Sequence, residues 1–263
     1  MDSFPDSMEF PSEPIPGAAV LITAAGSSSR FGTGQKKEFH PFLGETVLHH
    51  TFMAFLSTDL FTHYCITCLK DHQEETRHAL GKRILQTLGD RLILTEGGET
   101  RQESVRKGLE ALEQVSPSLV LIHDGARPWV SGEVIRRVYF AAAGTGAAAP
   151  GIPPVDAMKS VDERGMIRSH LERSSTMAIQ TPQGFAFSPI LEAHRKARED
   201  GRLYIDDTEI YHRYCGDVLA VPGDAANTKI TYVRDLPVSS SAHSLENPRE
   251  ESDSLPPMET EAL

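Results

Sequence analysis

The stretch Leu21–Phe39, LITAAGSSSRFGTGQKKEF, begins as an apolar strand and continues as a loop of small residues. Three basic side chains, Arg30, Lys36 and Lys37, lie within or at the end of that loop. Small residues let backbone N–H groups approach phosphate oxygens, and basic side chains neutralise the phosphate charge. The stretch therefore predicts a buried strand followed by an anion-binding loop. The alternative is a flexible, solvated basic loop.

The two commonest phosphate-binding loops do not match this stretch. A Walker A loop needs a Gly-Lys-Ser/Thr sequence after its first glycine, and none follows here. The dinucleotide fingerprint needs a third small residue after Gly32 and Gly34, but Lys37 stands at that position. If the loop binds phosphate, it therefore does so in a third way.

Apolar, β-rich runs alternate with segments of helical spacing through the first half of the chain. Strands are expected at 18–23, 64–69, 91–95 and 119–122, and helices at about 46–57, 73–88, 101–114 and 131–143. This alternation predicts an α/β fold with βαβ crossovers and a mostly parallel, Rossmann-like sheet. The nearly continuous apolar runs AVLI and LVLI are typical of strands that are buried on both faces.

Polar loops follow three of these strands, and in parallel sheets ligands bind beyond the carboxyl ends of the strands. In the loop HDGARP (123–128), Asp124 is a candidate Mg²⁺ ligand or ribose-hydroxyl acceptor, or alternatively a turn or helix-capping aspartate. Arg127 is a candidate for a second phosphate. In EGGETRQESV (96–105), Ser104 lies near a helix start, where Thr100 and Glu103 have the spacing of a capping box.

The second half of the chain has weaker periodicity. We expect residues 152–180 to extend from the main domain as a β-arm, with a hairpin turn near Arg164–Gly165. Helices are expected at 188–200 and within IDDTEIYHRYCG (205–216). The runs VLAVPG (218–223) and NTKITYV (227–233) are expected to close the sheet.

The formal net charge of −11 is concentrated at the two ends of the chain. Residues 1–17 carry −4 and residues 237–263 carry −5, so the domain between them, residues 18–236, carries only −2. Both acidic tails are rich in Pro, Ser and Glu, which predicts disorder. The acidic balance and the absence of a basic face argue against nucleic-acid binding.

Other sequence features limit the classes of protein to which this chain can belong. No apolar run approaches the ~20 residues that span a bilayer, and the N-terminus lacks the features of a signal peptide, so we expect a cytoplasmic protein without membrane association. Cys65 and Cys68 have zinc-knuckle spacing in CITC. In a strand, however, residues three apart point to opposite faces, which argues against a shared metal.

Six motifs occur in order across residues 18–236: TAAGSSSRFG with KKEF, GGETRQESV, HDGARP, ERSS with TPQGF, IDDTE and NTKIT. Together they resemble the 2-C-methyl-D-erythritol 4-phosphate cytidylyltransferases of non-mevalonate isoprenoid synthesis. The first motif alone is shared with many sugar-nucleotide pyrophosphorylases, whereas the ordered set is much more specific. The resemblance implies a nucleotidyltransferase that moves CMP from CTP to a polyol phosphate with Mg²⁺ as cofactor.

The resemblance also implies roles for particular residues. Arg30 and Lys37 would stabilise the transition state beside the triphosphate, and Lys229 would orient the attacking phosphate. Lys36 would be a solvated neighbour. The implied substrate-binding residues are Ala24, Ala25, Gly26, Gly97, Ser104, Asp124, Gly125, Arg127, Arg173 and Asp206, with Asp124 also the metal ligand.

Family members are homodimers that share active sites through the arm, and the resemblance extends this expectation to the present chain. Arg173 would then reach the substrate phosphate held by the partner subunit. Two positions depart from the commonest family pattern, since Ala157 and Asp206 stand where many members have Thr. A ribitol 5-phosphate cytidylyltransferase therefore remains an alternative, and a non-catalytic CTP-binding regulator is a more remote one.

Overall fold

The structure is a computed structural model that describes residues 10–32 and 34–237. Most of the two acidic tails predicted to be disordered, residues 1–9 and 238–263, therefore lies outside the described residues, as does Thr33.

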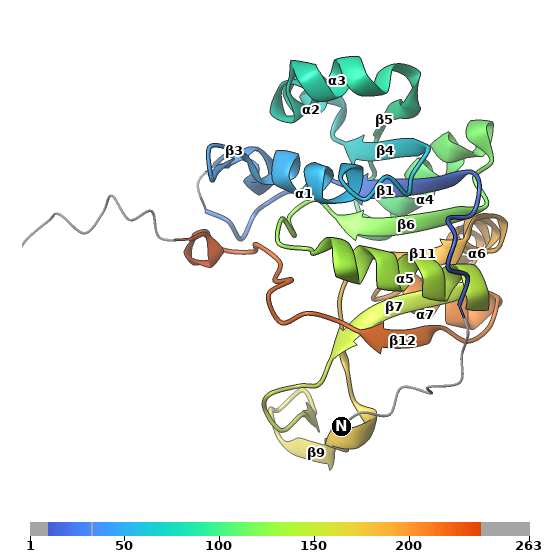
Figure 1. Ribbon diagram of the computed structural model, residues 1–263. Helices are drawn as coiled ribbons and strands as arrows, with labels where there is room; N and C mark the ends of the chain where they lie inside the picture. The colour runs from blue at the N-terminus through green and yellow to red at the C-terminus, as the bar shows by residue number, and fades with distance from the viewer. Residues whose placement is uncertain (1–9, 33, 238–263) are drawn as a thin grey trace, which may run out of the picture.

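An eight-stranded mixed sheet with a parallel core forms the centre of the described chain (Figure 1). Strand β1 (Ala18–Thr23) pairs in parallel with β4 (His63–Cys68) on one edge and β6 (Leu119–Asp124) on the other. Strand β5 (Leu92–Glu96) pairs in parallel with β4. This core confirms the predicted α/β fold.

The other half of the sheet is mixed. Strand β11 (Gln183–Ala186) pairs antiparallel with both β6 and β7 (Ala147–Ile152). Strand β10 (Ala178–Ile179) pairs antiparallel with β7, and β12 (Leu219–Pro222) pairs with it in parallel. The predicted final strand in NTKITYV is wrong, because residues 227–232 form no strand. Instead they cross the loop after β6, where the Ile230 amide donates to the Ala126 carbonyl at 2.9 Å.

Helices cover both faces of the sheet, which gives three layers (Figure 1). One face packs against α1 (Val47–Leu56), α2 (Gln73–Leu80), α3 (Lys82–Leu88) and α5 (Gly132–Thr145). The other packs against α4 (Arg101–Leu112), α6 (Phe187–Glu199) and α7 (Asp207–Tyr214). Alternate β1 residues enter the two cores, as the pleat of a strand buried on both faces requires. The helix predicted at 73–88 is broken at Gly81, whose φ of +82° favours glycine.

Short elements complete the described chain. The paired strands β2 (Pro41–Phe42) and β3 (Glu45–Thr46) precede α1. Single 3₁₀ turns occur at Lys37–Phe39, Lys70–His72, Gly89–Arg91, Glu113–Val115, Arg173–Ser175 and Val233–Asp235. Among the described helices, none is both long enough and apolar enough to cross a bilayer.

A close helix–strand contact fixes the position of α4. A Cβ atom added to Gly108 would lie 2.4 Å from Leu21 Cδ1 in β1, so a side chain there would force either Leu21 or the helix to shift. Glycine therefore lets α4 pack closely on β1. The N-terminus of α4 consequently lies beside the carboxyl end of that strand.

The arm, residues 152–180, leaves the sheet after β7 and returns to it through β10 (Figure 1). It contains an antiparallel hairpin of β8 (Lys159–Val161) and β9 (Ile167–His170), as the sequence predicts. Gly165 has a φ of +76° in the connecting turn. The hairpin projects away from the layers of the main domain, and its strand residues are exposed.

Candidate active site

A cavity of about 280 Å³ lies at the carboxyl ends of β1 and β6. Its walls come from the β1 loop (residues 24–32 and 34–36) with the 3₁₀ turn that follows it, the segment that begins α4, the turn after β6, and Lys229 with Thr231. The four segments meet there because parallel strands end at one edge of the sheet. Eight predicted site residues line the cavity: Ala25, Gly26, Arg30, Lys37, Ser104, Asp124, Gly125 and Lys229.

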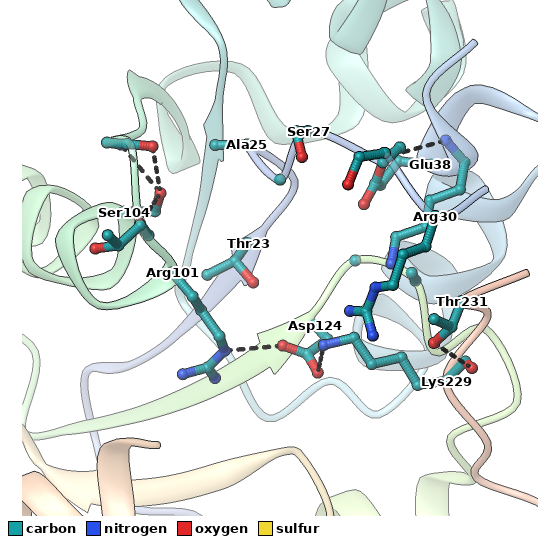
Figure 2. A pocket seen from close by; sticks show the side chains of 18 of the residues that line it. Thr23, Ala25, Ser27, Arg30, Glu38, Arg101, Ser104, Asp124, Lys229 and Thr231 are labelled. Carbon is teal, nitrogen blue, oxygen red and sulfur yellow. Dashed lines mark hydrogen bonds and ion pairs between the residues drawn. The ribbon is translucent and has the colours of Figure 1, made fainter. Parts of the chain in front are cut away.

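The Asp124 carboxylate is buried and lies among three cationic side chains. Its Oδ2 is 2.9 Å from Lys229 Nζ and 3.4 Å from Arg127 Nε, and its Oδ1 is 3.0 Å from Arg101 Nε. Figure 2 shows Arg101 and Lys229 approaching this carboxylate from opposite sides. Burial alone would raise the pKa of Asp124, but the three cations outweigh burial and hold that pKa well below its usual range. The carboxylate is therefore ionised at neutral pH.

Arg101 is a site residue that the sequence reasoning missed. It lines the cavity, and its guanidinium bridges two buried carboxylates, with Nη1 2.9 Å from Asp207 Oδ2. Burial disfavours its charge, but Asp207 and Asp124 outweigh burial and raise the pKa of Arg101. The His194 imidazole is fully buried, and its Nε2 lies 3.2 Å from Asp207 Oδ1. Side chains from α4, α6 and α7 thus form one polar chain that ends at Asp124.

The β1 loop turns back on itself through residues with positive φ, Ser28 at +52° and Gly32 at +80°. The Lys37 amide donates to Ser28 Oγ, and Ser28 Oγ–H donates to Glu38 Oε2, both at 3.3 Å. Burial raises the pKa of Glu38, although the nearby Lys37 opposes that shift. Figure 2 shows Arg30 extending from this loop into the cavity.

The two adjacent lysines have different environments. Lys37 lines the cavity and donates from Nζ to the Ile230 carbonyl at 3.0 Å. Burial lowers the pKa of Lys37, and Glu38 partly opposes this effect. The prediction that Lys36 is solvated is wrong: its side chain is buried, and its Nζ donates to the Ala24 carbonyl at 2.7 Å. A polar residue in a glycine-rich loop gives no sequence signal for such burial.

Ser104 lies one turn into α4, where it organises the preceding loop. Its Oγ accepts from the Gly98 amide at 3.0 Å and donates to the Thr100 carbonyl at 2.9 Å. Thr100 caps the helix by accepting from the Glu103 amide at 3.1 Å. The Glu103 carboxylate accepts from the Glu99 amide rather than from Thr100, so the predicted capping box is only half formed.

Five predicted site residues lie outside the lining of this cavity. Ala24 is fully buried, and Gly97 packs so closely that an added Cβ would lie 2.2 Å from Ala25 Cβ. Arg127 supports the site by holding Asp124 and donating from Nη1 to the Asn227 carbonyl at 2.8 Å. Arg173 lies on the arm and donates to the Val155 carbonyl at 2.8 Å. Asp206 caps α7 by accepting from the Glu209 amide at 3.0 Å.

A buried hydrogen-bond network supports Asp124 from behind. Thr181 Oγ1 accepts from the Asp124 amide at 3.3 Å and lies 3.0 Å from His123 Nδ1. His123 Nε2 lies 3.3 Å from the Arg127 carbonyl. Because a carbonyl only accepts, Nε2 carries a proton, and in a neutral imidazole Nδ1 then accepts from the Thr181 hydroxyl. Burial lowers the pKa of His123 to about 3. Asn227 Nδ2 joins the network by donating to the Thr181 carbonyl at 2.8 Å.

The donor set of the cavity fits a magnesium ion only if the substrate supplies further ligands. Nowhere within residues 10–32 and 34–237 do three or more His, Cys, Asp or Glu side chains form a group able to hold a metal ion. Asp124 nevertheless offers one buried carboxylate beside the β1 loop. Mg²⁺ is commonly bound by one or two carboxylates together with substrate phosphates and water.

Comparisons with known proteins agree with this architecture. The family model for 2-C-methyl-D-erythritol 4-phosphate cytidylyltransferase (IspD) matches residues 18–242. The bifunctional enzyme IspD/IspF of Mesorhizobium japonicum is 38% identical over 222 residues, which make up 84% of this chain and 53% of that protein. This chain thus spans about half the length of the curated relatives it matches.

Two solved structures have similar folds. The 2-C-methyl-D-erythritol 4-phosphate cytidylyltransferase from Thermus thermophilus is 34% identical, with a TM-score of 0.65 over 82% of this chain and 94% of that one. The 4-diphosphocytidyl-2C-methyl-D-erythritol synthase from Anaerococcus prevotii is 26% identical, with a TM-score of 0.73 over 83% and 92% of the two chains. The present chain belongs to the 2-C-methyl-D-erythritol 4-phosphate cytidylyltransferase family.

Proposed function

We propose that this protein transfers CMP from CTP to the phosphate of 2-C-methyl-D-erythritol 4-phosphate and releases pyrophosphate. The main support is the ionised Asp124, which lies among three cations and faces the small-residue β1 loop. A carboxylate and several positive charges in one cavity suit the binding of a nucleoside triphosphate with a metal ion. Family membership supports CTP and the polyol phosphate as the two substrates.

In the proposed reaction, an oxygen of the acceptor phosphate attacks the α-phosphorus of CTP as the bond to the pyrophosphate oxygen breaks. The nucleophile is already an anion, so no general base is required. Negative charge grows on the phosphoryl oxygens in the transition state. Lys37 and Arg30, which line the same cavity, would stabilise that charge. Lys229, 2.9 Å from Asp124, would orient the attacking phosphate.

Magnesium would be held by Asp124 together with the triphosphate. When bound, it supplies charge neutralisation and polarises the phosphoryl oxygens. The protein's own part is to keep Asp124 ionised through Arg101, Lys229 and Arg127. It also positions the β1 loop, where backbone N–H groups can bind phosphate oxygens.

We infer that the active unit is a homodimer in which the arm of one subunit completes the acceptor site of the other. Six large apolar side chains of the arm are at least 45% exposed: Val155, Met158, Val161, Met166, Ile167 and Leu171. Apolar side chains gathered on an exposed extension mark an interaction surface. Arg173, on the same arm and absent from this chain's cavity, would reach the partner's acceptor phosphate.

An acceptor panel with CTP tests the proposed activity. Pyrophosphate release is measured with 2-C-methyl-D-erythritol 4-phosphate, ribitol 5-phosphate, erythritol 4-phosphate and glycerol 3-phosphate. The expected kcat/KM for the methylerythritol substrate is at least about tenfold above erythritol 4-phosphate, which lacks only the methyl group. It is at least about a hundredfold above ribitol 5-phosphate and glycerol 3-phosphate, whose hydroxyls differ. A preference for ribitol 5-phosphate would replace the proposed acceptor. CTP binding without turnover of any acceptor would favour a non-catalytic regulator.

A further inference from the structure

The buried ammonium of Lys36 is a group that the proposed mechanism does not use. Its side chain is 7% exposed, and Nζ donates to the Ala24 carbonyl at 2.7 Å. A buried charge is costly unless it is well hydrogen-bonded, so the chain keeps this ammonium at the cost of desolvation. Burial also lowers the pKa of Lys36, although the nearby Glu38 partly opposes that effect.

The position of this bond explains what the ammonium can do. Ala24 and Lys36 are the first and last residues of the β1 loop, so the bond closes the loop at its base. Ala24 is itself fixed, because its amide donates to the Thr67 carbonyl of β4 at 2.8 Å. The loop is thus tied to the rigid parallel core rather than to another loop.

The same bond determines where the cavity residues lie. Lys37 follows Lys36 directly, and its amide donates back to Ser28 Oγ within the loop. The Phe39 amide donates to the Lys36 carbonyl at 3.1 Å, which connects Lys36 to the 3₁₀ turn Lys37–Phe39. Moving Lys36 would therefore move Lys37 and one wall of the cavity.

We propose that Lys36 is a positioning residue whose ammonium closes the β1 loop onto the end of β1 and so preorganises the loop and Lys37 for the triphosphate. This inference adds a positioning residue to the proposed function. Only the expected effect on CTP binding rests on that function. Lys36 touches no substrate in this scheme. Because Lys36 orders the loop before the nucleotide arrives, less conformational freedom is lost on binding.

The first test needs no ligand. Trypsin cleaves after Arg30, and the next residue, Phe31, is only 2% exposed, so cleavage there requires the loop to open. Lys36→Met removes the ammonium and retains an apolar stem, and we expect cleavage after Arg30 to be about tenfold faster, measured by mass spectrometry of the fragments. Lys82→Met, the same change at an exposed residue of α3, is the matched control and should leave the rate unchanged.

The second test separates positioning from catalysis. In Lys36→Met we expect the calorimetric Kd and the KM for CTP to rise about tenfold. The acceptor KM, and kcat at saturating CTP, should stay within about threefold of wild type. Lys36→Arg, which keeps a cation, should recover most of the CTP affinity. If Lys36→Met does not fold, Lys36→Gln is measured in its place.

Two results would overturn the proposal. Unchanged tryptic cleavage and unchanged CTP affinity in Lys36→Met would show that the ammonium does not order the loop. A loss confined to kcat, with cleavage unchanged, would show that Lys36 acts on the substrate directly. If the wild-type protein does not bind CTP, the proposed function fails, and the proteolysis comparison still decides the role of Lys36 in the loop.

Discussion

The cavity and the arm differ in how completely contacts within one chain pair or bury their side chains. In the cavity, Asp124 is surrounded by cations of its own chain, and Arg101 is paired with two carboxylates. On the arm, Val155 is 86% exposed and Ile167 is 57% exposed. The difference indicates that a single chain builds the nucleotide side of the proposed site, whereas the arm presents a surface suited to a second chain.

Lys37→Ala tests the cavity side of this comparison with the largest expected effect. Removing a cation that acts on transition-state charge should lower kcat about a thousandfold, or roughly 4 kcal/mol, while the Kd for CTP changes only a few-fold. Steady-state kinetics and calorimetry on the same preparation measure the two effects. The exposed Lys70→Ala is the control. A fully active Lys37→Ala enzyme would refute the catalytic assignment.

Asp207→Asn tests whether the polar chain behind Asp124 matters to the site. Asp207 is fully buried between Arg101 and His194, so removing its charge leaves the Arg101 guanidinium paired with Asp124 alone. We expect a loss of about 3 kcal/mol in the free energy of unfolding and about tenfold weaker CTP binding. Denaturant titration and calorimetry measure these two changes.

The control for that variant is Asp217→Asn, because Asp217 is fully exposed just after α7 and pairs with the exposed His212. It should change neither quantity measurably. Equal effects of the two variants would contradict the role given to Asp207.

Charging the arm tests the other side of the comparison. Val161 and Ile167 are paired across the hairpin and are 60% and 57% exposed, so replacing both with Asp should leave the subunit folded. We expect the proposed dimer to dissociate and the acceptor KM to rise about thirtyfold, since the partner's arginine proposed to contact the phosphate would be lost. CTP affinity should be unchanged. Sedimentation velocity and kinetics measure these outcomes, and an intact dimer with wild-type kinetics would remove the arm from the interface.

The sequence predicted the parallel core and the position of the cavity because both follow from local patterns. Apolar runs separated by helical segments determine a parallel sheet, and its strand ends determine where ligands bind. The NTKITYV segment was predicted as a strand because it has β-rich composition. It instead crosses the loop after β6, where Ile230 bonds to Ala126. Competition between sheet pairing and loop pairing depends on tertiary neighbours that composition does not reveal.

Local sequence patterns also do not predict which charged side chains pair in the folded protein. Arg101 stands within the quoted motif GGETRQES, but its importance comes from Asp124 and Asp207, which are distant in sequence. Lys36 and Lys37 are adjacent, and only the folded loop shows that one is tied to β1 and the other faces the cavity. Residues whose roles depend on long-range partners therefore required the structure.

The support behind Asp124 predicts a pH dependence of stability, an effect that is smallest at neutral pH and grows only on acidification. His123 is buried as a neutral imidazole, chiefly because desolvation lowers its pKa from 6.5 to about 3; Asp124 opposes this shift, and Arg127 adds to it. Between those pH values the unfolded chain binds the proton and the folded chain does not, so stability falls as pH falls below 6.5. The slope is about 1.4 kcal/mol per pH unit. Thermal unfolding of wild type and His123→Gln between about pH 4 and pH 7.5 measures it. The Tm of wild type should fall more steeply on acidification than that of the variant, and parallel curves would show that folding does not lower the pKa of His123.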